Sequence, residues 1–248
     1  QSTGSPRTLF GVGLREAPLS IAEGDIRDYG AVENAMRDSD AVIHLAAITG
    51  AESTHDRQAE TVAVNYDGTE NVLQAAEKYD VENVVFASSC NLYGRAARTE
   101  ISEATEPDPL NPYAETKRDA EELLRERVEE GQFQGTALRM STNFGHSPGV
   151  RFNLVVNYFV FRALTDRPLT VYGDGSNWRP FIHVRDAARA YEHATLNPAQ
   201  YEHLIYNVGA NDQNYQISEI AEAVREELST DLVISYLEDR KPGPSYHV

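Results

Sequence analysis

Residues 84–94 read Val-Val-Phe-Ala-Ser-Ser-Cys-Asn-Leu-Tyr-Gly, an apolar run that changes into small hydroxylated residues. Such a run is typical of a buried strand in a parallel sheet. Ligands bind doubly wound sheets at the carboxyl ends of the strands, and Ser89 stands at that end of the run. The stretch therefore predicts an α/β fold with a binding site beside Ser89.

A second stretch, residues 111–117, reads Asn-Pro-Tyr-Ala-Glu-Thr-Lys and predicts the start of a helix. Asn111 can cap the helix, and Pro112 suits its first turn, where no N–H is needed. Tyr113 and Lys117 stand four residues apart, so both side chains lie on one face. A neighbouring ammonium lowers the pKa of a phenol, which makes Tyr113 a candidate acid/base, although an ordinary amphipathic helix could show the same spacing. We interpret the Glu-rich far end of this helix as a solvated face.

A strand-end Ser followed about twenty residues later by Tyr-x-x-x-Lys resembles the extended short-chain dehydrogenase/reductase family, in particular its nucleotide-sugar epimerases and dehydratases. The resemblance implies that Ser89 orients the substrate, that Tyr113 is the acid/base and that Lys117 is its electrostatic partner. It also implies NAD as cofactor, a nucleoside-diphosphate sugar as substrate and a homodimer.

The composition of the 248 residues, 41% hydrophobic and 25% charged, is typical of a globular protein. No apolar run approaches the length of a membrane span, and the single Cys fits a reducing cytoplasm. The net charge of −17 argues against a nucleic-acid partner. The seven His show no spacing typical of a metal site. With 3 Lys and 19 Arg, the chain suggests a halophilic source or, equally, a GC-rich genome.

The N-terminal part carries further motifs of the family. A short strand is expected at 18–23, followed by Gly-Asp-Ile-Arg-Asp, in which the resemblance assigns Asp25 and Ile26 to the adenine. Residues 40–47 predict a buried strand whose small terminal residues, Ala46 and Ala47, let a cofactor approach; His44 is expected to be a packed strand residue. Within a long helix at 61–79, the family's Asn-x-x-Gly-Thr-x-Asn motif places Asn65 facing the site.

The C-terminal part resembles the family's substrate lobe. A strand is expected at 135–140; after it, Thr142 stands where family members carry an Asn that contacts the sugar nucleotide. Further positions match contacts to the nucleotide base, and two arginines match contacts to the diphosphate, for which a guanidinium fork is well suited. The base positions are Asn153, Leu154 and Tyr172, and the arginines are Arg179 and Arg240.

Apolar strand runs that alternate with helix-length segments predict a Rossmann-like, doubly wound parallel sheet with a small C-terminal substrate lobe. We expect a dinucleotide-binding domain at 1–150, and at 151–248 mainly a substrate lobe with segments that return to the main domain. The family's first strand, glycine-rich turn and helix have no counterpart in this sequence. We therefore expect a piece of a longer protein, in which the pyrophosphate cradle is missing.

The resemblance favours an NAD-dependent nucleotide-sugar epimerase, with a 4-epimerase of a UDP-sugar as its most specific form. In that mechanism Tyr113 removes a hydroxyl proton, and the sugar is oxidised transiently to a keto sugar. One alternative is a nucleotide-sugar 4,6-dehydratase, but family dehydratases carry acidic residues where this chain has Cys90 and Asn91. Another alternative is a non-catalytic dinucleotide-sensing protein on the same fold, although such proteins commonly lose the Tyr or the Lys.

Overall fold

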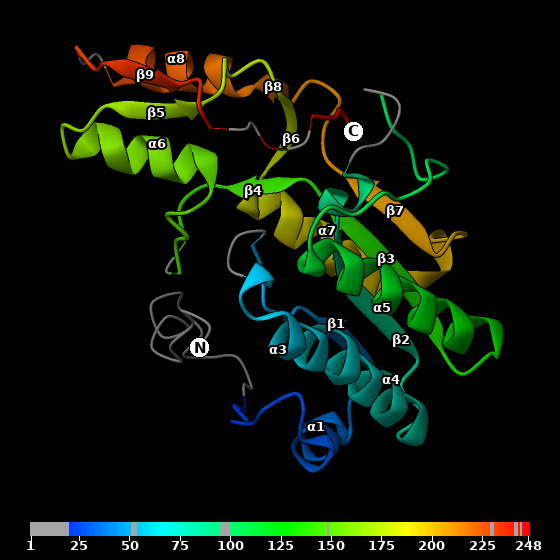
Figure 1. Ribbon diagram of the computed structural model, residues 1–248. Coiled ribbons are helices and arrows are strands. Elements are labelled where there is room, and N and C mark those ends of the chain that lie inside the picture. Colours follow the sequence, from blue (N-terminus) through cyan, green and yellow to red (C-terminus); the bar gives the residue numbers. More distant parts are fainter. Residues whose placement is uncertain are drawn as a thin grey trace.

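The centre of the molecule is a parallel sheet with the strand order β1-β2-β3-β7 (Figure 1). The computed structural model describes residues 20–50, 54–94, 100–147, 149–228, 231–240, 243 and 245–248. In β2 and β3, Ser89 stands beside Met140, so the two strands end at the same edge of the sheet. The four strands are β1 (Ala41–His44), β2 (Asn83–Ser89), β3 (Gln134–Met140) and β7 (Ile205–Val208). The α/β fold with a parallel sheet is thus confirmed.

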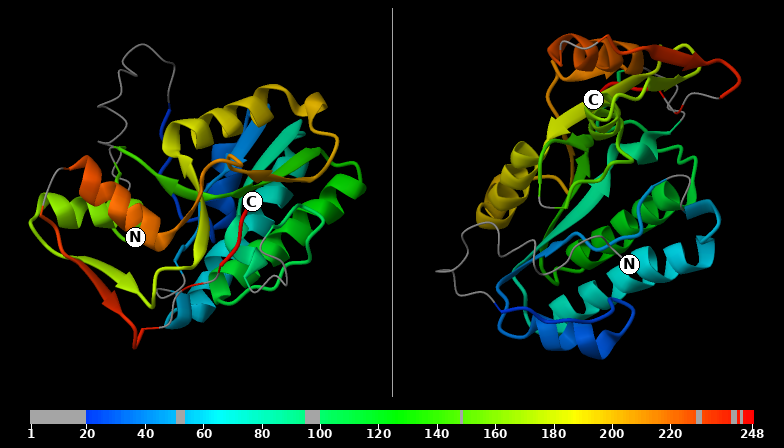
Figure 2. Two further views of the ribbon diagram at one scale, coloured as in Figure 1. Left: turned by 90° about the horizontal axis from the view of Figure 1, so that it is seen from above. Right: turned by 90° about the vertical axis from the view of Figure 1, so that its left-hand side faces the viewer.

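Helices cover both faces of this sheet. Figure 2 shows α7 on the face opposite α4 and α5. Side chains from the sheet and the helices form the core, with Leu73, Val84, Phe86 and Leu124 almost completely buried. The helices of the main body are α1 (Tyr29–Met36), α3 (Gln58–Val62), α4 (Gly68–Lys78), α5 (Pro112–Glu129) and α7 (Val184–Leu196).

Smaller sheets form the C-terminal lobe, at the top of Figure 1. One sheet has the order β4-β6-β8, and another pairs β5 with β9 in parallel. Helices α6 and α8 pack on the second sheet through Phe159, Leu169, Val171 and Ala221. The elements of the lobe are β4 (Thr142–Phe144), α6 (Val155–Leu164), β5 (Leu169–Tyr172), β6 (Trp178–His183), β8 (Asn214–Gln216), α8 (Ile217–Glu227) and β9 (Ile234–Leu237). Between β6 and β8 the chain returns to the main sheet, where it forms α7, the short 3₁₀ turn η5 (Pro198–Gln200) and β7.

The long helix expected at 61–79 is continuous but not uniform. It runs from α3 through a π-helical segment, η3 (Ala63–Asp67), into α4. Gly68 begins α4 against the loop before α1, and a Cβ atom at Gly68 would lie 2.7 Å from the side chain of Ile26. The glycine of the Asn-x-x-Gly-Thr motif is therefore required by close packing.

The prediction of a strand at 18–23 is wrong for residues 20–23, the part of this range that the structure describes. Residues 20–23 are exposed and have no regular secondary structure, and residues 18 and 19 lie outside the described part. A strand needs a hydrogen-bonding neighbour, and no described strand lies beside these residues or pairs with the second edge of β1. Ile43 and Leu45 are correspondingly 41% and 58% exposed at this edge.

We find no helix, in the part of the chain that the structure describes, with the length and apolar character needed to cross a membrane.

Candidate active site

The predicted acid/base residues meet where β2 ends. Ser89 is the last residue of β2 and caps the following 3₁₀ helix, η4 (Cys90–Tyr93), because its Oγ accepts a hydrogen bond from the Asn91 N–H at 3.2 Å. Asn111 caps α5 as expected, since its Oδ1 accepts from the Ala114 N–H at 3.0 Å. Its Nδ2 also donates to Asn91 Oδ1 at 3.2 Å, which ties the start of α5 to the end of β2. Tyr113, in the first turn of α5, thereby lies close enough to Ser89 for the serine hydroxyl to act on the pKa of the phenol.

The electrostatics of Tyr113 differ from the prediction made from its spacing to Lys117. Burial raises the pKa of Tyr113, because a phenolate would lose its hydration. Among the described residues, the Ser89 hydroxyl and the charge of Arg151 act in the opposite direction and lower the pKa of Tyr113. The expectation that Lys117 gives Tyr113 a lowered pKa is therefore wrong for this structure, since the net direction is upward.

Lys117 is 2% exposed, which is unusual for an ammonium group. Its Nζ donates to the carbonyl oxygen of Ala87 at 2.6 Å and lies 4.5 Å from the centre of the Phe86 ring. Burial lowers the pKa of Lys117 to about 7, and the charge of Glu121 opposes this effect. A lysine with such a pKa changes its charge near neutral pH, which is a common property of residues in functional sites.

Asn65 connects three segments behind this pair. The residue is 1% exposed and lies in the π-helical segment η3, a kind of irregularity that is frequent at functional sites. Its amide accepts from the Ile48 N–H at 2.7 Å and donates to the Ile48 carbonyl oxygen at 2.9 Å. It also donates to Thr116 Oγ1 on α5 at 3.0 Å. Asn65 thus holds the loop after β1 against α5, the helix that carries Tyr113 and Lys117.

The residues assigned to the adenine line a groove along β1. The groove has a volume of about 520 Å³, and its lining includes Gly24, Asp25, Ile26 and Ala46. The Asp25 carboxylate is exposed and bonded to Arg27 at 2.6 Å, and this hydrogen bond lowers its pKa to about 2. Small residues along the loops let a flat ligand approach the backbone, so the groove could hold part of a dinucleotide.

His44 is a packed residue of β1, as predicted. It is 4% exposed, and its Nε2 lies 2.9 Å from Thr69 Oγ1. Burial first, and then the charge of Lys117, lowers the pKa of His44 to about 3, so the ring is neutral at pH 7. In the part of the chain described here, no group of three or more His, Cys, Asp or Glu side chains could bind a metal ion.

The residues assigned to the sugar nucleotide are spread over the small lobe. Arg179 in β6 lies 5.1 Å from the centre of the Tyr246 ring, and burial lowers the pKa of Arg179. Thr142 is half-buried in β4, and Leu154 precedes α6. The remaining side chains are exposed, and no described hydrogen bond joins them to Tyr113; they are Asn153, Tyr172 and Arg240.

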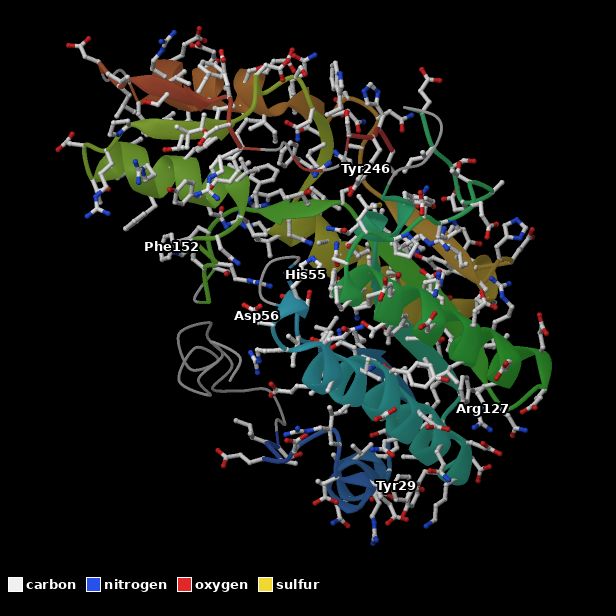
Figure 3. All side chains as sticks on the ribbon, in the orientation of Figure 1. Tyr29, His55, Asp56, Arg127, Phe152 and Tyr246 are labelled. Carbon is white, nitrogen blue, oxygen red and sulfur yellow. The ribbon has the colours of Figure 1, made fainter. Side chains whose placement is uncertain are left out.

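Tyr246 lies beside the candidate site, and the sequence interpretation did not include it. It is 3% exposed and packs with Cys90 and Ala114, close to the end of β2 and the start of α5. Its N–H donates to the carbonyl oxygen of Trp178 at 3.3 Å, so it lies between β6 of the small lobe and the main body (Figure 3). Local sequence gave no signal for this position, because the contact joins the last residues of the chain to residues near 90 and 114.

The Glu-rich end of α5 is only partly the solvated face that we expected. Glu121 is buried, with a side chain that is 1% exposed, and it pairs with Arg139 in β3 at 2.6 Å. The sequence contained a signal for this ion pair, because an Arg inside the apolar run Ala-Leu-Arg-Met needs a buried partner.

The sequence interpretation also missed Arg151. Its Nη1 bonds to Thr49 Oγ1, and its charge acts on Tyr113.

Comparison with known proteins identifies the family. The model of the NAD dependent epimerase/dehydratase family matches residues 5–209. The low-salt glycan biosynthesis protein Agl12 of Haloferax volcanii is 30% identical over 223 residues, which are 89% of this chain and 70% of that protein. The dTDP-glucose 4,6-dehydratase of Mycobacterium tuberculosis is 28% identical over 236 residues, which are 94% of this chain and 66% of that protein.

Solved structures agree with this match. The UDP-glucose 4-epimerase of Thermus thermophilus, in complex with NAD, superimposes with a TM-score of 0.79 and 26% identity, over 94% of this chain and 77% of that chain. Both an epimerase and a dehydratase are thus among the similar proteins. The family match spans most of the chain and includes Ser89, Tyr113 and Lys117. The chain therefore belongs to the NAD dependent epimerase/dehydratase family.

Proposed function

We propose that this protein is an NAD-dependent epimerase of a nucleoside-diphosphate sugar, most specifically a UDP-sugar 4-epimerase. The observation that carries the proposal is the meeting of Ser89, Tyr113 and Lys117 at the carboxyl end of β2. Ligands bind parallel sheets at that edge, so a sugar hydroxyl placed there can contact both the serine and the tyrosine.

The groove along β1 supports NAD as the cofactor. Its volume of about 520 Å³ and its small lining residues, including Gly24 and Ala46, fit the adenosine half of a dinucleotide. Asp25 and Ile26 would hold that half, and Lys117 would face the nicotinamide ribose. When bound, NAD supplies a hydride acceptor that later returns the hydride to the sugar.

The chain's own residues handle the proton and the orientation of the sugar. Ser89 would hold the reacting sugar hydroxyl by a hydrogen bond, and the Tyr113 oxygen would accept its proton. Because burial raises the pKa of Tyr113, its ionisation depends on the neighbouring Ser89 hydroxyl and on the charge of Arg151, which both lower that pKa. On the side of the small lobe, Arg179 would bind the diphosphate, with Tyr246 packed between it and the catalytic residues.

The two residues after Ser89 favour an epimerase over a dehydratase. Elimination of water needs a further acid/base pair. Cys90 is 1% exposed, its Sγ donates to the Arg139 carbonyl oxygen at 3.1 Å, and burial raises its pKa to about 12. Asn91 does not titrate, and its side chain is bonded to Asn111. Neither position can therefore supply the additional proton transfer.

Incubation of the full-length protein with a panel of UDP- and dTDP-sugars tests the proposal. The products are analysed by mass spectrometry and proton NMR. An epimerase gives a product of unchanged mass with an inverted carbon, whereas a dehydratase gives a keto sugar lighter by one water. Absence of any product across the panel would refute an enzymatic function on these substrates. The homodimer and the cytoplasmic location stay predictions.

A further inference from the structure

A buried ion pair joins the catalytic helix to the strand next to β2. Arg139 in β3 donates from Nε to Glu121 Oε1 at 2.9 Å and from Nη2 to Oε2 at 2.6 Å. The two side chains are 4% and 1% exposed. A bidentate pair of this kind is strongly directional, because the planar guanidinium fits a carboxylate in one orientation.

Further hydrogen bonds extend from this ion pair to Ser88 on one side and to Tyr93 on the other. Ser88, directly before Ser89, donates from Oγ to Glu121 Oε1 at 2.5 Å. On the other side, Arg139 donates from Nη1 to the Tyr93 hydroxyl at 2.7 Å, and this hydroxyl donates to Asn207 Oδ1 in β7, also at 2.7 Å. The network thus spans α5, β2, β3, η4 and β7 with fixed donor and acceptor geometry.

Glu121 follows Lys117 by four residues, as Lys117 follows Tyr113, so the three side chains lie along one face of α5. We propose, on the basis of the proposed function, that Glu121 and Arg139 form a positioning pair, which locks α5 to the ends of β2 and β3 and thereby sets where Tyr113 and Lys117 lie relative to Ser89. Neither member of the pair contacts the reacting atoms, so both act through other residues.

The pair also has an electrostatic consequence for Lys117. Among the described residues, His44 on β1 and Glu121 on α5 interact electrostatically with this ammonium; Tyr113 precedes Lys117 by four residues on α5, and Arg139 on β3 is bonded to Glu121. His44 is neutral at pH 7, because burial lowers its pKa to about 3. Glu121 is therefore the described group whose charge favours the ammonium form against burial.

Two variants separate positioning from a purely structural role. Glu121→Gln removes the charge at nearly constant shape. The double variant Glu121→Met with Arg139→Met replaces the whole pair by apolar side chains, an exchange that buried ion pairs often tolerate without loss of stability. The control is Glu122→Gln, the neighbouring residue on α5, whose exposed carboxylate pairs with Arg125 at 3.3 Å.

The first measurement is the titration of Lys117 by lysine-¹⁵N NMR in the full-length protein, with the signal assigned through a Lys117→Met variant. We expect the titration midpoint to move to lower pH in Glu121→Gln and in the double Met variant, and to stay unchanged in the control. This readout does not depend on catalysis, so it tests the inference even if the proposed substrates are not converted.

The second measurement is turnover. A displacement of about 1 Å at catalytic groups can cost about 100-fold in rate. We expect kcat to fall by about 10- to 100-fold in both variants, with little change in KM. A folded double Met variant with wild-type kcat and an unchanged Lys117 midpoint would overturn the proposal, because the pair would then serve stability alone. If that variant does not fold, the same two results in Glu121→Gln decide the question.

Discussion

Lys117→Met should make the protein more stable at neutral pH, although it removes a proposed catalytic residue. The unfolded chain carries this lysine with its usual pKa of 10.5, whereas burial lowers the pKa to about 7 in the folded protein. At about 1.4 kcal/mol for each pKa unit, this difference costs the wild type about 5 kcal/mol of folding free energy. The variant loses the hydrogen bond to Ala87, worth about 1–3 kcal/mol. The expected net gain at pH 7 is therefore about 2–4 kcal/mol.

The gain in folding stability of Lys117→Met should depend on pH in a way that identifies its cause. Between pH 7 and 10.5 the unfolded wild type binds the lysine proton more strongly than the folded wild type, so wild-type stability rises with pH in this window. The advantage of the variant should shrink by about 1.4 kcal/mol for each pH unit, so a gain of about 2–4 kcal/mol at pH 7 vanishes between about pH 8.5 and 10. Below pH 7 both states bind the proton, and the difference becomes constant.

Urea denaturation of both full-length proteins at pH 7, 8, 9 and 10 measures this difference directly. Lys78→Met is the matched control, because Lys78 is exposed and its pKa is raised by its bond to Glu33. The control should show no stabilisation at pH 7. A Lys117→Met variant that is no more stable than wild type, or a gain that does not change between pH 7 and 10, would refute the reasoning.

The remaining predictions concern single residues of the site. Tyr113→Phe should reduce turnover about a thousandfold or more and leave sugar-nucleotide binding intact by calorimetry; activity within tenfold of wild type would exclude Tyr113 as the base. Arg151→Gln should move the limb of the pH–rate profile that reports Tyr113 to higher pH, because a charge that favours the phenolate is lost; the exposed Arg189→Gln is the control. Cys90 should resist iodoacetamide in the native protein and react after unfolding, since burial raises its pKa to about 12. Asn65→Ala should cost about 1–3 kcal/mol in urea denaturation, because the hydrogen bonds of the loop after β1 are lost.

Most of the elements that form the site could be predicted from the sequence. The apolar run before Ser89 became β2, and the segment that begins at Asn111 became α5 with the expected cap. These signals are local: a helix cap and an apolar run act over a few residues, so they can be read without the fold. The predicted strand at 18–23 failed where the structure describes it, because a strand depends on a neighbour that its own residues do not specify.

The burial and protonation of Tyr113 and Lys117 could not be predicted in the same way. Spacing placed Tyr113 and Lys117 on one face of a helix, but it carried no information on how deeply each would be buried. Burial dominates the pKa of both groups, and it raises one and lowers the other. The predicted direction of the Tyr113 pKa shift was wrong for that reason.

The sequence by itself determined the strand end at Ser89, the helix with Tyr113 and Lys117 four residues apart, and the family resemblance that the comparison confirmed. Only the tertiary structure decided that Glu121 meets Arg139 and that Tyr246 packs beside Cys90. The physical reason is that these contacts join residues far apart in the chain. They exist only after β2, β3 and α5 have packed, when a buried charge must find its partner among the side chains that the fold has brought into reach.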